Sequence, residues 1–431
     1  MSKLQRGAIC VLIAAAFSGG AVAAPCGEPS SSASAIVPGA PITLRAVMDE
    51  IANAAPQVRR AALETKARQA EVDQAGRRLN PIVGVELENF AGSGPLSGFG
   101  ETETTFSLEQ TFELGNKRSL RREAANANAA LASAECGAIL RQTQLEAAIL
   151  FYELGAAVQV ADFANESAAL AQTLVETVET RVKAGAAAPP ELSRVRADAI
   201  ALQAAAEGAK ARVQSLRYDL AAMWGDAAPN FAAPVTKAAS LPSAILTGET
   251  KIDSHPLLDM ASAQTVVSEA NQDLAQSQSM PDVTLSAGFR RFEQGNDNAL
   301  LFGVSVPFPI FDKNRDAVKA AGFRRQADML NRVAIERDLI SQQNAARAQL
   351  ISAQKQLSLL ETNALREARS AYDASVKGYR AGKFDLTTTL TTRKALIDAK
   401  LAVIDAARTV NIQDITLRSL TGAAPFTGDI Q

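Results

Sequence analysis

Residues 105–123 read TFSLEQTFELGNKRSLRRE, and only the pair 115–116 separates a strand pattern from a helix pattern. Before that pair, apolar and polar residues alternate, which is typical of a strand with one apolar face. After it, charged residues and strong helix formers begin. A similar change occurs in residues 301–316, LFGVSVPFPIFDKNRD, where Pro307 and Pro309 are present instead of a glycine. The chain is therefore expected to turn from strand into helix at two places of similar design.

These two places belong to an internal duplication. Residues 55–81 match residues 255–281, with prolines near the start and at the end of both segments. Further along, Lys-Ala-Gly at 183–185 aligns with Arg-Ala-Gly at 380–382. Between these matches, four residues of the first copy align with four of the second: Phe106, Phe112, Leu114 and Lys117 with Phe302, Phe308, Ile310 and Lys313. Matches that recur in the same order indicate a repeated structural unit.

Each copy is predicted to consist of a helix, two strands, a very long helix and a shorter returning helix. The predicted strands are residues 81–91 and 103–114 in the first copy and 282–292 and 299–310 in the second. No proline occurs between Gly115 and Ala188 or between Ile310 and Ala424, so both long helices are expected to run without a break. The first would be about 100 Å long at the rise of an α-helix. The chain is expected to turn back at two tips, residues 182–191 and 379–388.

The N-terminus reads as a secretory signal peptide over residues 1–23, because a basic start precedes a short apolar run and the small residues 21–23. The remaining predicted segments are an N-terminal extension (24–42), a first repeat (43–225), a linker (226–253), a second repeat (254–422) and a C-terminal tail (423–431). Cys26 lies just after the predicted cleavage point. Attachment of a lipid to Cys26 and pairing of Cys26 with Cys136 both remain open from the sequence.

Composition excludes several classes of function. The 44 basic and 46 acidic residues are spread along the chain, so no nucleic-acid partner is expected. The single histidine, His255, precedes a predicted helix, and no cluster of ligands at metal-binding spacing accompanies it. No catalytic motif is present. We therefore expect neither a metal site nor a cofactor, and no enzymatic activity.

The predicted strands have an apolar face with no obvious cover in the chain. Nine of the sixteen phenylalanines fall within residues 81–114 and 281–311, and aromatic residues on alternating strands are typical of a transmembrane β-barrel. Four strands cannot close a barrel, so several copies would have to contribute, and three copies would give twelve strands. The alternative is a sandwich or a sheet covered by helices.

The whole mature chain resembles the TolC-type outer-membrane efflux proteins. Residues 110–118, QTFELGNKR, are similar to the QPxELGGKR stretch of the outer-membrane components of cobalt–zinc–cadmium and cobalt–nickel heavy-metal RND efflux systems. Residues 307–314, PFPIFDKN, are similar to the PLPLFDRN stretch of their second repeat. The chain departs from the first pattern at Thr111 and Asn116, which weakens the assignment of a metal substrate more than that of the fold.

The resemblance implies a mostly α fold with a β-barrel part, in which a homotrimer forms a 12-stranded outer-membrane β-barrel and a long periplasmic α-helical barrel. It implies passive conduction of divalent heavy-metal cations, an inner-membrane RND pump, a periplasmic adaptor and contact with outer-membrane lipid. At the tips, adaptor contact or the aperture would involve Lys183, Gly185, Arg380, Gly382, Lys383 and Asp385. The junction of barrel and tunnel would involve Gly115, Lys117, Arg118, Pro307, Pro309 and Lys313.

Other functions remain open from the sequence. The charges at the tips could simply solvate exposed turns. The same fold could export organic drugs, or secreted proteins in type I secretion. A periplasmic adaptor protein is a further alternative, although it would carry one helical hairpin and no duplicated strand pairs.

Overall fold

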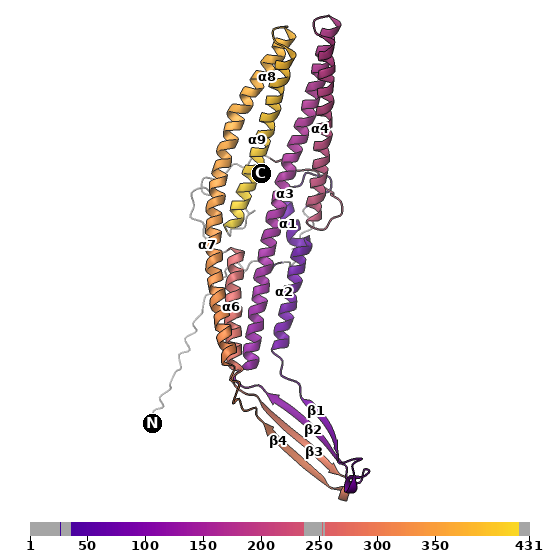
Figure 1. Cartoon of the computed structure of the whole chain (residues 1–431), viewed down its shortest axis with the longest axis vertical. Coiled ribbons are helices and arrows are strands. Elements are labelled where there is room, and N and C mark those ends of the chain that lie inside the picture. The colour runs from indigo at the N-terminus through magenta and orange to yellow at the C-terminus, as the bar shows by residue number, and fades with distance from the viewer. Residues whose placement is uncertain (1–25, 27–35, 237–251, 253–254, 422–431) are drawn as a thin grey trace, which may run out of the picture.

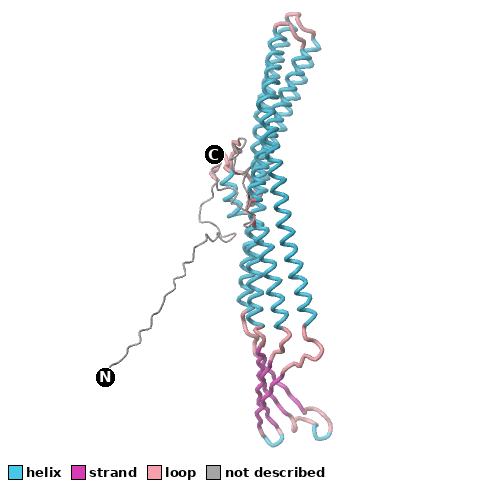
Figure 2. The backbone as a smooth tube through the Cα atoms, turned by 90° about the vertical axis from the view of Figure 1, so that its left-hand side faces the viewer, coloured by secondary structure: helices cyan, strands magenta, loops and turns pink. Residues whose placement is uncertain are grey.

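The computed structural model describes residues 26, 36–236, 252 and 255–421. The predicted signal peptide, the predicted tail, most of the linker and much of the extension lie outside the described residues. The described part is elongated, with long helices over most of its length and a small sheet at one end (Figure 1). Figure 2, which colours the chain by secondary structure, shows that the sheet extends beyond the ends of the helices.

Four helices come from the first copy: α1 (Leu44–Ala54), α2 (Pro56–Ala75), α3 (Lys117–Lys183) and α4 (Pro189–Ala222). The sequence predicted a single helix before the strands, and the structure divides it into α1 and α2. The reason is Pro56, which cannot continue the hydrogen bonding of α1 but is well tolerated as the first residue of α2. The unbroken length of α3 agrees with the prediction.

The second copy contributes α6 (Pro256–Ser277), α7 (Arg315–Leu359), α8 (Leu365–Arg380) and α9 (Leu386–Leu420). A π-helical turn, Leu360–Ala364, lies between α7 and α8. The sequence predicted an uninterrupted helix here, because the interval contains no proline. A π-turn, in which an extra residue is accommodated within the helical path, can form without a proline, so it was missed.

The sheet contains β1 (Ile82–Glu88), β2 (Glu103–Phe112), β3 (Val283–Phe292) and β4 (Asn298–Ser305). The strands are antiparallel in the order β1-β2-β3-β4, so the pairing of β2 with β3 joins the two copies. Strand β4 ends at Ser305, earlier than the predicted end near residue 310. The apolar alternation continues beyond Ser305, but Pro307 and Pro309 have no N–H groups to donate to a neighbouring strand.

The start of the long helix differs slightly between the sequence alignment and the structure. Asn116 precedes α3 and Asn314 precedes α7, and both have left-handed backbone, with φ of 59° and 55°. The structural counterpart of Lys117 is therefore Arg315. The predicted equivalence of Lys117 and Lys313 is wrong by two positions.

The helices form a curved layer in which α3 is central. Near the sheet the order across the layer is α2, α3, α6, α7, and toward the tips it is α4, α3, α9, α8. One segment of α3 is long and apolar enough, by length and composition, to cross a membrane, and 44% of it is buried inside the structure. Because α3 contacts five other helices, α1, α2, α4, α6 and α9, we interpret this segment as the core of the layer.

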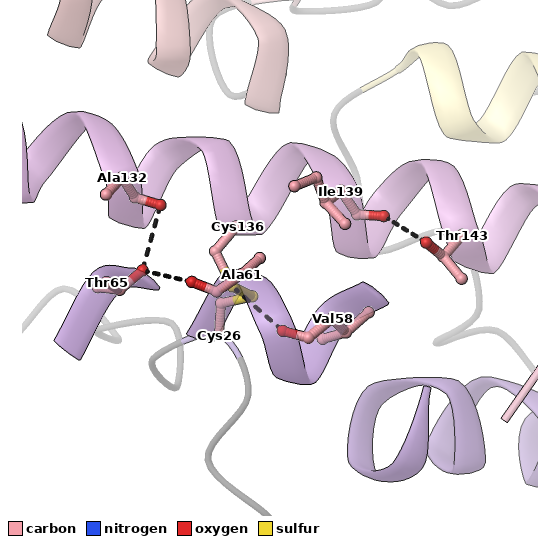
Figure 3. The surroundings of a disulfide bond; sticks show 8 residues. All are labelled: Cys26, Val58, Ala61, Thr65, Ala132, Cys136, Ile139 and Thr143. Carbon is pink, nitrogen blue, oxygen red and sulfur yellow. Dashed lines mark hydrogen bonds between the residues drawn. A yellow bond between two sulfur atoms is a disulfide. The ribbon is translucent and has the colours of Figure 1, made fainter. Parts of the chain in front are cut away.

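The largest buried cluster lies at the waist of the molecule and contains residues of α1, α3 and α4. It contains Ile51, Leu154, Leu220 and Trp224. Beside it, Cys26 and Cys136 form a disulfide. Figure 3 shows this bond between α2 and α3. Of the two fates that the sequence left open for Cys26, the structure contains the pairing with Cys136.

Candidate functional site

One face of the sheet is apolar, and no described residue covers it. In one row across the four strands, Val85, Phe106, Phe289 and Leu300 are register partners. All four are exposed, and Phe302 on the same face is 84% exposed. The alternative of a sheet covered by helices is therefore wrong for the described chain. A bare apolar face of this size requires a nonaqueous environment or a partner.

The opposite face is polar and carries an excess of acidic residues. Side chains alternate between the two faces along each strand, so the residues between the apolar positions lie on this face. Its charged residues within the strands are Glu86, Glu88, Glu103, Glu109 and Arg290. Among the described residues, neither Glu86 nor Glu109 makes an ion pair. The face is therefore net negative and will attract cations.

Arg290 connects three strands on this polar face. Its Nη2 lies 2.9 Å from Glu88 Oε2, and its Nη1 lies 2.7 Å from Glu103 Oε2. Its Nε donates to Thr105 Oγ1 at 2.8 Å. One guanidinium thus holds β1, β2 and β3 in register. It forms ion pairs with only two of the four glutamates.

The first strand-to-helix junction is fixed by polar contacts. Asp282, just before β3, accepts from Lys117 Nζ at 2.7 Å and from the backbone N–H of Leu114 at 3.1 Å. Arg121 donates to both carboxylate oxygens of Glu113. Gly115 has φ of +67°, and a Cβ there would lie 3.2 Å from Ser277 O. Of the two basic residues predicted at this junction, Lys117 is held internally and Arg118 is exposed.

The second junction is held differently. Asn314 donates from its side chain to Ala275 O, and its backbone N–H donates to Asp312 Oδ1 at 2.8 Å. Of the predicted residues, Pro307 and Lys313 are exposed and Pro309 is half-buried. Large aromatic residues accompany them, and these are Phe308, 86% exposed, and Phe311, 99% exposed.

The predicted tip residues occupy two separate turns. Gly185 and Gly382 have φ of +69° and +71°, which explains glycine at both turns. Lys183 pairs with Glu179 at 3.0 Å, whereas Arg380 and Lys383 are exposed and make no ion pair with a described residue.

Asp385, the remaining predicted tip residue, is the N-cap of α9. Its Oδ1 accepts from the backbone N–H of Thr388 at 2.8 Å. The hydrogen bonds from Thr388 lower the pKa of Asp385, so this carboxylate is charged at neutral pH.

Sequence reasoning missed the contacts that join the two tips. Arg181 stacks over the ring of Tyr379 at 4.7 Å and donates to its carbonyl oxygen at 2.7 Å. The Tyr379 hydroxyl donates to Glu191 Oε2 at 3.1 Å. Burial, with the neighbouring Glu191, raises the pKa of Tyr379, so the phenol keeps the proton that it donates. These contacts join residues almost two hundred positions apart, which no local pattern reveals.

A second link lies deeper, between α9 and α4. Arg393 is 4% exposed and pairs with Asp198. Its position could have been noticed, because Arg393 follows Leu386 and Thr389 at helical spacing on the buried face of α9. A charged residue on such a face requires a partner.

His255 has the structural role that the sequence predicted. Its Nδ1 accepts from the backbone N–H of Leu257 at 3.2 Å, so it caps α6. Burial lowers the pKa of His255, which favours the neutral ring that can accept this bond. Within the described residues, no group of three or more His, Cys, Asp or Glu side chains could hold a metal ion.

The comparison with protein families decides the class of this architecture. The pattern of the family described as "Outer membrane efflux protein" matches residues 47–226 and 249–423. The chain belongs to this family. Each matched segment contains one of the two strand pairs. The protein is accordingly an outer-membrane efflux channel that extends into the periplasm, and it is a passive conduit, which confirms that it is not an enzyme.

Named relatives of this efflux protein come from metal-resistance systems. It is 28% identical over 367 residues to the cobalt-zinc-cadmium resistance protein CzcC of Cupriavidus metallidurans, which covers 84% of this chain and 85% of that protein. It is 30% identical over 271 residues to the nickel and cobalt resistance protein CnrC of the same organism, covering 62% and 63% of the two chains.

Solved structures show the same fold. The outer membrane protein VceC from Vibrio cholerae superposes with a TM-score of 0.73 at 20% identity, over 88% of this chain and 96% of VceC. CusC superposes with a TM-score of 0.75 at 15% identity, over 88% and 91% of the two chains. The predicted TolC-type architecture is thus confirmed at the level of the fold.

Proposed function

We propose that this efflux protein is the outer-membrane conduit of a heavy-metal tripartite pump. It would work as a homotrimer that passively conducts divalent cations received from a periplasmic adaptor and an inner-membrane RND pump. The observation that carries the proposal is the sheet, which has one bare apolar face, one acidic face and two open edges.

The open edges support a ring. Strands β1 and β4 are the edges of the sheet, and α2 with α4 and α7 with α8 are the corresponding edges of the helical layer. In a membrane an unpaired strand edge is costly, so β4 of one copy would pair with β1 of the next. Repeating one head-to-tail contact around an axis generates a closed ring. Three copies would give twelve strands, enough to leave a lumen.

Closure in this way would assign the two faces of the sheet. The apolar face would contact outer-membrane lipid, and the polar face with its four glutamates would line the exit. A negatively charged lumen concentrates cations relative to anions. This charge, the names of the relatives and the stretch at residues 110–118 together favour metal cations as cargo.

The tips are the proposed region of adaptor contact. Lys183, Arg380 and Lys383 present positive charge at the two turns, and both glycine turns are exposed. Asp385 would act mainly as a helix cap, since its carboxylate is already used by Thr388.

The experiment is deletion of the gene, followed by complementation. Loss of tolerance to zinc, cadmium, cobalt or nickel, restored by the wild-type chain, would support the proposal. Unchanged metal tolerance with new sensitivity to detergents or dyes would favour export of organic drugs, and loss of a secreted protein would favour type I secretion. The variant Glu86→Gln/Glu109→Gln should restore metal tolerance only in part, whereas Glu64→Gln on the exposed surface of α2 should restore it fully.

A further inference from the structure

The N-terminal segment of this efflux protein is fixed to the helical layer at its waist. Cys136 is completely buried on α3, in a cluster with Ala61 and Ala62 of α2, and Cys26 packs against the same cluster. Nearby, Thr65 Oγ1 donates to Ala132 O at 3.2 Å and so ties α2 to α3 (Figure 3). The disulfide therefore lies within a packed interface between two helices.

We propose that the Cys26–Cys136 disulfide is the covalent anchor of the mature N-terminus and that it takes the place of a lipid on Cys26. A sulfur atom in a disulfide has both of its bonds occupied, so the same atom cannot carry a thioether to a diacylglyceryl group. Cys26 is the cysteine closest to the predicted cleavage point, which makes the two modifications direct alternatives.

The position of the bond also places the anchor away from the membrane. Cys136 lies nineteen residues beyond Lys117, the first residue of α3 beside the sheet. At the rise of an α-helix this is about 29 Å. While it is joined to Cys136, Cys26 therefore lies among the helices, far from the apolar face of the sheet.

The other end of the segment is held by noncovalent contacts. Ile36 and Ile42 are buried in the waist cluster. Gly39 N–H donates to Asn230 O at 2.7 Å, and Ile42 N–H donates to Ala232 O at 3.1 Å. The described part of the N-terminal segment is therefore attached at two points, at Cys26 through the disulfide and at residues 36–42 through these contacts.

Formation of this anchor requires an oxidant. The two thiols lose two protons and two electrons as the S–S bond forms. A protein disulfide of the exported compartment would accept the electrons and become a dithiol by thiol–disulfide exchange. Formation of the disulfide would therefore depend on export and on a thiol oxidant.

The pairing of Cys26 with Cys136 also affects how the chain would hold metal cargo, a point that rests on the proposed function. Thiolates are strong ligands for soft cations such as cadmium. With Cys26 and Cys136 joined, the described chain presents no free thiolate to hold such cargo.

The direct test is the mass of the mature chain. The full-length protein is extracted from the outer membrane, denatured, and treated with a maleimide before or after reduction. We expect no lipid mass, no labelling of Cys26 or Cys136 before reduction, and labelling of both after it. A diacylglyceryl mass on the Cys26 peptide, or labelling without reduction, would overturn the proposal.

Stability provides a second readout. Reduction of the folded wild-type protein should speed protease cleavage of the N-terminal segment about tenfold or more, because the segment then loses its covalent link to α3. Cys26→Ser, Cys136→Ser and the double variant should show the same faster cleavage with no response to reductant. Thr65→Val, which changes the neighbouring contact, should keep the response. A wild-type cleavage rate unaffected by reduction would contradict the anchor even if the serine variants fail to fold.

A different result for metal transport would not affect this test. The proposed cargo fails if deletion leaves metal tolerance unchanged, whereas the anchor fails only on the mass, labelling and cleavage measurements.

Discussion

The two strand-to-helix junctions have the same design but are stabilised by different contacts. Both place an asparagine in left-handed backbone immediately before a long helix. In the first, Asp282 bridges from the second copy to Lys117, whose side chain is only 13% exposed. In the second, two prolines and exposed aromatic residues precede Asn314, and no described residue makes an ion pair with Lys313. Duplication thus preserved the backbone turn, while the side chains that stabilise it diverged.

This difference has a consequence for the membrane-proximal surface. The first junction satisfies its own charges and ties the two copies together. The second presents Phe308 and Phe311 to its surroundings beside basic residues, a combination that suits the interface between lipid and water. If the first junction is the more tightly held of the two, substitutions there should lower the free energy of unfolding more than matched substitutions at the second.

The largest effect is expected for Gly115→Val. A β-branched residue is strained at φ of +67°, and its Cβ would lie 3.2 Å from Met280 Cβ. We expect a loss of about 3 kcal/mol in the free energy of unfolding, measured by urea titration of the detergent-extracted protein. The matched control is Lys313→Val, which precedes Asn314 as Gly115 precedes Asn116, and it should change stability by no more than about 0.5 kcal/mol. Equal losses would mean that the glycine has no special role.

Removal of the bridging carboxylate should come next. Asp282→Ala leaves the ammonium of Lys117 without its partner in a half-buried position, and we expect a loss of about 2 kcal/mol. Asp312→Ala removes only one backbone contact at the second junction and should cost about 0.5–1 kcal/mol. The same titration measures both variants. If Asp312→Ala were the more damaging, the comparison of the junctions would be reversed.

The two asparagines should differ by a smaller amount. Replacement by alanine costs about 1 kcal/mol at either position, because alanine is disfavoured in left-handed backbone. Asn314→Ala should cost more than Asn116→Ala, because Asn314 also donates to Ala275 O. Glycine at position 116 should be close to neutral. A large loss for Asn116→Gly would show that its side chain has an unrecognised role.

The smallest effect is expected for Pro309→Ala. Pro309 is only half-buried, and it acts mainly by restricting the unfolded chain, so the expected loss is about 0.5 kcal/mol. Differential hydrogen exchange of the region after β4 would show whether the freed backbone becomes more mobile. Unchanged exchange would mean that the remaining contacts of the junction are sufficient to order it.

Much of the fold followed directly from local pattern. Alternation located all four strands, and the long intervals without proline located the long helices. The end of β4 was missed because the alternation of apolar residues continues to Ile310, although the prolines stop the hydrogen bonding. The break at Pro56 was missed although proline marks it, because the residues on both sides are helix formers. The π-turn was missed because no residue type marks it.

The contacts of the candidate site were harder to predict. Lys117 and Asp282 lie far apart in sequence, as do Tyr379 and Glu191, and only the folded chain brings them together. The same applies to Cys26 and Cys136, whose sequence separation is 110. The buried position of Arg393 was the one signal available from helical spacing alone.

The central claim is that copies of this chain close head to tail around an acidic exit in the outer membrane. Electron microscopy of the protein extracted from that membrane tests it most directly. We expect a threefold ring of twelve strands, with β4 of each copy paired to β1 of the next and Glu86 and Glu109 facing the lumen. A soluble monomer, or a ring in which the apolar face of the sheet lines the lumen, would contradict it.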